Sequence, residues 1–169
     1  MSQDTLSDVL RSVRLRGAVF FHISGHSDWA AEAPPAREIA PLIMPGVEHV
    51  VEYHAIVRGS CWAGIPGGPM AHLQAGDVVM FPHGDAHVVS SAPGLRGSAD
   101  MSWLDGARPE QLPIRVAYDG RNVELVPEPR LEADTTIVCG FLGCDMQPFN
   151  PLIASLPRML HLRPSEPDA

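Results

Sequence analysis

Short runs in which polar and apolar residues alternate dominate the middle of the chain, and turn-forming residues separate these runs. Such alternation is typical of short strands that bury one face and expose the other. It predicts strands over five successive segments, residues 48–57, 60–65, 70–73, 77–81 and 86–91. Strands this short, joined by turns this frequent, indicate a β-sandwich or barrel.

The N-terminal part is predicted to contribute one short helix and one strand. The helix follows from apolar residues that recur at helical spacing, Leu6, Val9, Leu10 and Val13. Residues 17–23 then form a strand. Residues 24–46 are rich in Ala and Pro, so we expect a covering loop with at most one edge strand there.

The second half of the chain begins with a polar, glycine-containing loop over residues 92–112. Loops of this length are usually functional or mobile. A hairpin is predicted over residues 113–126, because Asp119-Gly120 is a strong signal for a tight turn. Residues 135–141 are apolar enough to form a further buried strand.

A helical segment is expected over residues 150–162, with Asn150 as its N-cap and Pro151 at its first position. Pro157 must kink this helix or start a second one. The segment carries one apolar stripe, Leu152, Ile153, Leu156, Met159 and Leu160. The stripe can either seal the barrel or pair two subunits. Residues 163–169 are expected to be a flexible tail.

Composition fits one globular domain whose core spans about residues 16–145. Apolar residues make up 45% of the 169 residues, and the 15 Gly and 17 Pro fit a turn-rich, mostly β fold. No apolar run has the length of a membrane span, and the first residues lack the apolar core of a signal peptide. We therefore expect a cytoplasmic protein.

Charge and cysteine content narrow the function classes. The net charge is −8 and all 12 basic residues are Arg, so this domain is a poor match for a nucleic-acid backbone. The three Cys are odd in number, which favours reduced thiols or metal ligands over a disulfide framework.

One motif indicates the fold. Residues 76–87 follow the pattern G-x5-P-x-G-x2-H, in which Gly76 permits a tight turn, and Pro82 and Gly84 force a reversal that returns His87 toward the preceding strand. This pattern resembles the second cupin motif. Glu52 lies seven residues before Gly59 and matches part of the first cupin motif, but the His-x-His that precedes that glutamate is absent. The resemblance implies a double-stranded β-helix, or jelly-roll barrel, with short N-terminal and C-terminal helices.

A closer resemblance covers most of the chain. Residues 52–62, 75–94, 137–145 and 149–162, in that order, are similar to the N-terminal cupin domain of AraC-type transcriptional regulators. In that family the domain binds an effector or mediates dimerisation, and a helix-turn-helix part that follows it binds DNA. Here the chain ends soon after residues 149–162. The resemblance implies either an excised sensor domain or a natural stand-alone relative.

Two His and two Cys are candidate zinc ligands. His83 and His87 lie four apart across the reversal, and Cys139 and Cys144 lie five apart near the end of a strand. Two imidazoles and two thiolates suit tetrahedral zinc, with Asp85 and Asp145 available to orient the imidazoles. The alternative is that Cys139 is a small buried apolar residue and that His83 completes an exposed turn.

Glu52 and His54 project to the same face of one strand, toward the barrel interior, which His87 should also approach. These three side chains either form an open iron site of the two-His, one-carboxylate type or hydrogen-bond one another and line a polar ligand pocket. We expect the ligand pocket to include Glu52, His54, Trp62 and Phe81.

The sequence thus favours a ligand-sensing and dimerisation module of an AraC-like regulator, with a small-molecule effector and a structural zinc. No residue is assigned a catalytic role. The alternatives are a stand-alone metal-dependent cupin enzyme, of the dioxygenase or isomerase type, and an oligomerisation scaffold without a ligand.

Overall fold

The computed structural model describes residues 16–106, 112–120, 122–144 and 151–164. The helix expected at residues 6–13, the N-cap Asn150 and residues 165–169 of the expected tail lie outside the described residues.

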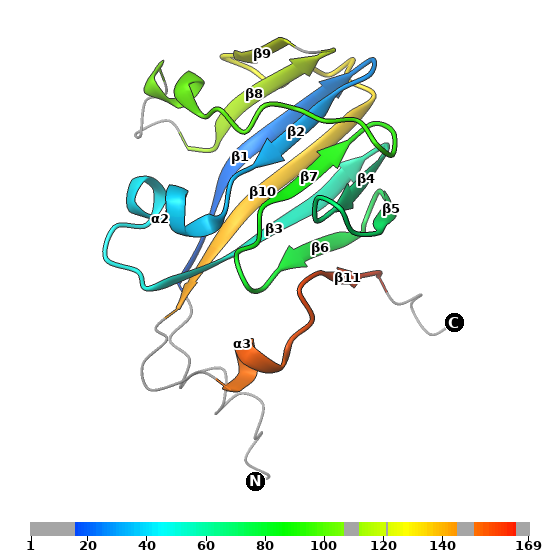
Figure 1. Ribbon diagram of the computed structural model, residues 1–169. Coiled ribbons are helices and arrows are strands. Elements are labelled where there is room, and N and C mark those ends of the chain that lie inside the picture. Colours follow the sequence, from blue (N-terminus) through cyan, green and yellow to red (C-terminus); the bar gives the residue numbers. More distant parts are fainter. Residues whose placement is uncertain (1–15, 107–111, 121, 145–150, 165–169) are drawn as a thin grey trace, which may run out of the picture.

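Two β-sheets face each other and form the body of the molecule (Figure 1). The seven-stranded sheet has the order β11 (Leu160–Leu162), β6 (Val78–Phe81), β3 (His49–Arg58), β10 (Thr135–Cys144), β1 (Arg16–His26), β8 (Ile114–Asp119) and β9 (Asn122–Leu125). The four-stranded sheet has the order β2 (Ala30–Ala33), β7 (His87–Ser90), β4 (Ser60–Gly64) and β5 (Met70–Gln74). The mostly β, two-sheet architecture is confirmed.

The alternation of polar and apolar residues located the central strands well. Each of the five strands expected between residues 48 and 91 appears within one residue of its expected ends. The hairpin β8–β9 turns where Asp119 pairs with Asn122, and Gly120 has a φ of +59°. The strand expected at residues 135–141 extends to Cys144.

Residues 24–46 differ from the expected loop because they contain a helix. β2 is the expected edge strand of the smaller sheet. Helix α2 (Ala36–Ile43) follows it and buries Ala36 and Ile39. The backbone N–H of Ala36 donates to the carbonyl of Gly84 at 2.9 Å, so the helix begins against the reversal between β6 and β7. Gly84 has a φ of +66°, and a Cβ there would lie 2.8 Å from the Ala36 side chain.

The C-terminal segment is helical only before Pro157, so the helical conformation expected as far as residue 162 is wrong. Helix α3 (Pro151–Ser155) ends before Pro157, and β11 then pairs antiparallel with β6. Pro157 lacks a backbone N–H, which is why the helix does not continue through it. Ile153 packs with Val51 and Cys144 on the outer face of the larger sheet. This part of the apolar stripe covers the chain's own sheet.

Polar contacts hold the C-terminal segment against the turns that flank β6. The Arg158 guanidinium binds both carboxylate oxygens of Asp85, and His161 Nε2 lies 2.9 Å from an Asp77 carboxylate oxygen. His83 Nε2 lies 2.8 Å from the carbonyl of Leu156. The segment is therefore tied to the same reversal that leads into His87.

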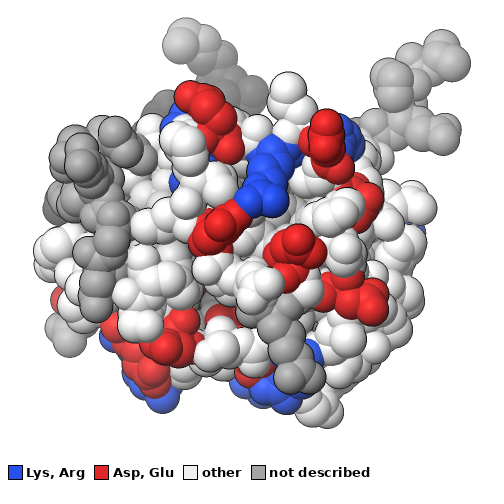
Figure 2. All heavy atoms as spheres, turned by 90° about the horizontal axis from the view of Figure 1, so that it is seen from above, with Lys and Arg blue, Asp and Glu red and all other residues white. Residues whose placement is uncertain are grey.

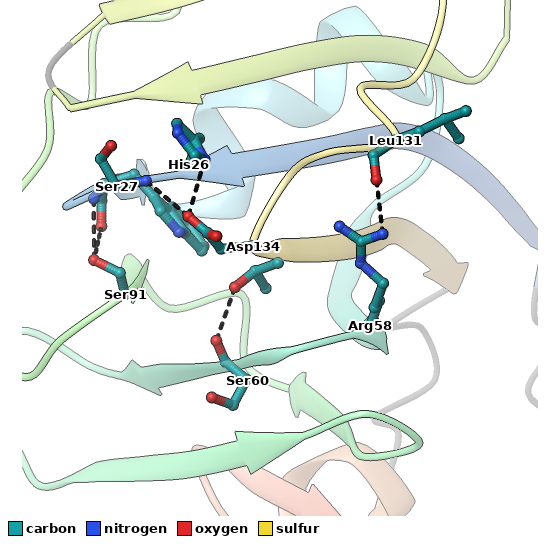
Figure 3. A network of polar contacts seen from close by, with 9 residues as sticks. His26, Ser27, Arg58, Ser60, Ser91, Leu131 and Asp134 are labelled. Carbon is teal, nitrogen blue, oxygen red and sulfur yellow. Dashed lines mark hydrogen bonds and ion pairs between the residues drawn. The ribbon is translucent and has the colours of Figure 1, made fainter.

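A second set of polar contacts fastens the turn between β1 and β2 (Figure 3). The Asp134 carboxylate accepts from the backbone N–H of Ser27 and lies 3.0 Å from His26 Nδ1. Nearby, the Thr135 hydroxyl donates to the Ser60 carbonyl at 2.9 Å. Of these contacts, the bond from Thr135 of β10 to Ser60 of β4 joins the two sheets.

Part of the polar loop expected over residues 92–112 packs against the core. It contains the 3₁₀ helix η1 (Ser102–Gly106), whose Trp103 packs against the main apolar cluster.

Figure 2 shows more acidic than basic side chains on the face seen from above, as the net charge of −8 leads one to expect. No helix within the described ranges is long and apolar enough to cross a membrane.

Candidate functional site

A cavity of about 60 Å³ lies between the two sheets. Strands β1, β3, β8 and β10 supply one side of its lining, and β2 and β7 supply the other. Met101 and Trp103, from the part of the chain at and just before η1, complete the lining together with Ile39 of α2. The cavity is thus built from parts of the chain that are far apart in the sequence.

The walls are mainly apolar and rich in aromatic rings. Phe21 contacts both Trp103 and Phe141 edge to face, with 5.9 Å between ring centroids in each pair. Edge-to-face contact is a favourable arrangement for aromatic rings, so these three side chains form one continuous aromatic wall. The remaining apolar lining residues include Ile23, Val89, Val116, Tyr118 and Ile137.

Four polar side chains gather in the lining, Glu52, His54, His87 and Cys139. His54 lies between two of the others. Its Nδ1 is 2.7 Å from the Cys139 sulfur, and its Nε2 is 2.6 Å from His87 Nε2. On its other side, the His87 Nδ1 is 2.9 Å from the carbonyl oxygen of Asp85.

These contacts fix the proton positions of both imidazoles when the rings are neutral. The Asp85 carbonyl can only accept, so His87 donates from Nδ1 and its Nε2 must be an acceptor. His54 therefore donates from Nε2 to His87. Its own Nδ1 is then the acceptor for the Cys139 thiol. A single line of hydrogen bonds runs from Cys139 through both rings to the backbone at Asp85.

Burial keeps every group of this line uncharged near neutral pH. Burial, aided by the neighbouring His87, holds the pKa of His54 well below its usual value. Burial lowers the pKa of His87 to about 4. It also raises the pKa of the Cys139 thiol, because a thiolate would lose its hydration there.

Glu52 lies beside this line of hydrogen bonds but is too far from His87 to form a hydrogen bond with it. The residue is 2% exposed, and one carboxyl oxygen is 3.8 Å from His87 Nε2. The other oxygen, Oε1, has no hydrogen-bond partner within the described part of the chain. Burial raises the pKa of Glu52 to about 8, so the carboxyl is mostly protonated at neutral pH. The cavity therefore contains one polar group whose bonding capacity is unused.

The structure does not bring the four proposed zinc ligands together. Cys139 and Cys144 are an odd number of residues apart on β10, so their side chains point to opposite faces of the sheet. Cys139 lines the cavity, whereas Cys144 packs with Ile153 on the outer face. His83 is exposed and bound to the carbonyl of Leu156, away from His87. These residues do not fit the expected zinc site.

Glu52, His54 and His87 do come together, but not in the geometry of a metal site. Two imidazole nitrogens that bind one tetrahedral zinc at about 2.1 Å would be about 3.4 Å apart. The Nε2 atoms of His54 and His87 are 2.6 Å apart, as in a hydrogen bond. Among the described residues there is no group of three or more His, Cys, Asp or Glu side chains placed to hold a metal ion.

Two of the four residues expected to line the pocket do line the cavity, and two do not. Glu52 and His54 line the cavity. Phe81 is fully buried and stacks on His87, with 3.8 Å between ring centroids, so it supports the ring rather than lining the cavity. Trp62 projects from the outer face of the smaller sheet, where it packs on His72. It does not reach the cavity.

The contact between Cys139 and His54 was not predicted from the sequence. The two residues lie directly opposite each other in the pairing of β10 with β3. Phe21 and Tyr118 were also not predicted as walls of the cavity. The periodicity of a strand predicts which face of the sheet each side chain lies on, but not which residue lies opposite it on the next strand. These contacts depend on the pairing register, which the sequence pattern does not give.

A comparison with curated proteins found no match. A family model described as Cupin matches residues 4–169, nearly the whole length of the chain. The two-sheet fold and the reversal at residues 76–87 agree with that match. The chain therefore belongs to the cupin family.

Proposed function

We propose that this cupin domain binds a small molecule in the cavity between its sheets, and that this binding is the sensing step of an AraC-like transcriptional regulator. One observation carries the proposal. Glu52 belongs to the lining of an apolar cavity, and its buried Oε1 lacks a hydrogen-bond partner among the described residues. Buried polar groups normally have partners, and a ligand would supply the missing one.

The size of the cavity limits the ligand. Its 60 Å³ is less than the roughly 150 Å³ of an engineered protein cavity that accepts benzene. A ligand larger than a few non-hydrogen atoms needs movement of the segment that carries Met101 and Trp103. That segment belongs to a loop, and loops move more readily than paired strands.

A binding role fits the polar groups better than a metal-dependent reaction does. His54 uses both ring nitrogens in hydrogen bonds, one to Cys139 and one to His87. A metal would have to break this line before it could bind His54. The metal-dependent cupin enzyme is therefore the weaker alternative.

The contacts of His87 offer a route from the cavity to the C-terminal segment. His87 bonds to the backbone of Asp85, and the Asp85 carboxylate binds Arg158. A ligand that moves His87 would disturb the reversal on which residues 151–164 are fastened. In AraC-type regulators the DNA-binding part follows this position, so we propose that binding is signalled through this segment. Dimerisation remains part of the proposal, although Ile153 is buried within its own subunit.

Xenon tests whether the cavity accepts a guest at all. Xenon enters apolar cavities without needing a specific contact. We expect xenon to shift the methyl resonances of Ile23, Val89 and Ile137 in NMR spectra. The matched variant Val89→Phe, which fills the cavity, should lose these shifts at Ile23 and Ile137. If xenon leaves the wild-type resonances unchanged, the proposed binding function is wrong.

A further inference from the structure

The cavity holds a carboxyl group in an environment that offers it no cation. None of the described residues that line the cavity is Lys or Arg. Glu32 also lines it, but its carboxylate is paired with Arg96. His87 Nε2 lies nearest to Glu52, yet it already accepts from His54. Glu52 thus has no partner that could stabilise its ionised form.

Aromatic rings lie on both sides of Glu52 in the larger sheet. Phe141 of β10 and Phe81 of β6 are its direct partners in the strand pairing. Side chains at paired positions project to the same face and are neighbours. Phe141 in turn contacts Phe21, which contacts Trp103. The faces of aromatic rings attract cations, most strongly away from water.

We infer that the cavity binds a small primary alkylamine, whose ammonium group pairs with Glu52 and whose alkyl part packs against Phe21, Phe141 and Trp103. This inference rests on the proposed function, because it names the class of ligand for the same cavity. An anionic ligand would place a second negative group beside Glu52. A neutral alcohol would gain only an uncharged hydrogen bond, which is weaker than a charge-assisted one.

The pKa values of the amine and of Glu52 determine how many protons are released when the amine binds. Alkylamines have a pKa near that of Lys, about 10.4, so the amine enters as an ammonium ion. Burial raises the pKa of Glu52 to about 8, so its carboxyl starts mostly protonated at pH 7. Pairing with the ammonium ionises Glu52, and about one proton is released to the solvent. The other titratable groups at the cavity, His54, His87, Cys139, Tyr118 and Glu32, keep their protonation states.

Isothermal titration calorimetry of the whole chain with ethylamine, and with ethanol as its neutral counterpart of equal size, tests the inference. At pH 7 we expect the amine to bind about tenfold more tightly than the alcohol. Its binding enthalpy should depend on the ionisation enthalpy of the buffer, as release of one proton requires. The affinity for the amine should rise as the pH increases from 6 to 8, because less proton release is then needed.

The variant Glu52→Gln should lose the preference for the amine and keep the affinity for the alcohol. Glu38→Gln, which removes an exposed carboxylate on α2, should behave as wild type. If Glu52→Gln does not fold, the buffer dependence in the wild-type protein decides the question. Equal or tighter binding of ethanol, or no buffer dependence with the amine, overturns the amine inference and leaves the binding function standing. Loss of xenon binding as well would overturn both.

Discussion

His54 and His87 share one hydrogen bond between their Nε2 atoms, at 2.6 Å, although they belong to different sheets. Neither ring can be replaced without leaving the other, or Cys139, with an unused polar atom. This contact therefore joins the two halves of the barrel at the edge of the cavity.

We expect His54→Leu to destabilise the domain by about 2–3 kcal/mol. The substitution leaves the Cys139 thiol and His87 Nε2 buried without partners. Chemical denaturation measures the loss. His72→Leu, at an exposed position on β5, is the matched control and should change stability little. Equal losses in the two variants would show that the line of hydrogen bonds does not stabilise the fold.

We expect Glu52→Gln to stabilise the protein increasingly as the pH rises from 4.5 to 8. The folded state raises the pKa of Glu52 from 4.5 to about 8, so within this range the folded state binds a proton that the unfolded state does not. Stability of the wild type therefore falls as the pH rises, and the Gln variant lacks this loss. The difference should reach the order of 4 kcal/mol near pH 8. Denaturation at pH 5 and pH 8 would contradict this if the difference were the same at both.

A fall in pH should destabilise the folded state through the two buried imidazoles, whereas Glu52 destabilises it as the pH rises. Burial lowers the pKa values of His54 and His87, the latter from 6.5 to about 4. Between these values the unfolded state binds protons that the folded state excludes, so stability is lost as the pH falls below about 6.5. Thermal unfolding followed from pH 7 to pH 4 measures the loss. His87→Gln should reduce the slope, and an unchanged slope would assign the acid sensitivity to other groups.

The C-terminal segment should depend on apolar burial more than on its surface ion pair. Ile153 is 5% exposed and packs against Val51 and Cys144, so Ile153→Ala should cost about 2–3 kcal/mol. Arg158→Gln removes the contact with Asp85 at an exposed position and should change stability little. Denaturation of both variants compares the two. A larger effect of Arg158→Gln would show that the ion pair is what holds the segment.

Removal of metal should leave the fold unchanged. Cys144 and His83 lie outside the cavity, and His54 is already bonded at both nitrogens. We expect the melting temperature to be the same before and after treatment with a strong chelator. The chelator should have the same lack of effect on Cys144→Ser. A drop in the wild-type melting temperature alone would restore the zinc hypothesis.

The sequence by itself determined the strands from residue 48 to residue 91 and the reversal at residues 76–87. Alternation of polar and apolar residues is a local property, and Gly76, Pro82 and Gly84 restrict the backbone wherever the rest of the chain lies. It also placed Glu52, His54 and His87 toward one interior. These predictions needed no knowledge of which strands pair.

Only the tertiary structure decided what those side chains do. The register of β10 against β3 places Cys139 opposite His54. Because Cys144 is an odd number of residues from Cys139 on β10, its side chain lies on the other face of the sheet. Helix α2 forms within a Pro-rich stretch because Ile39 buries against the core, a gain that local propensity does not contain. The bonds of His54 and the unused oxygen of Glu52 depend on contacts between distant strands. A one-residue change in register would move every one of those side chains to the other face.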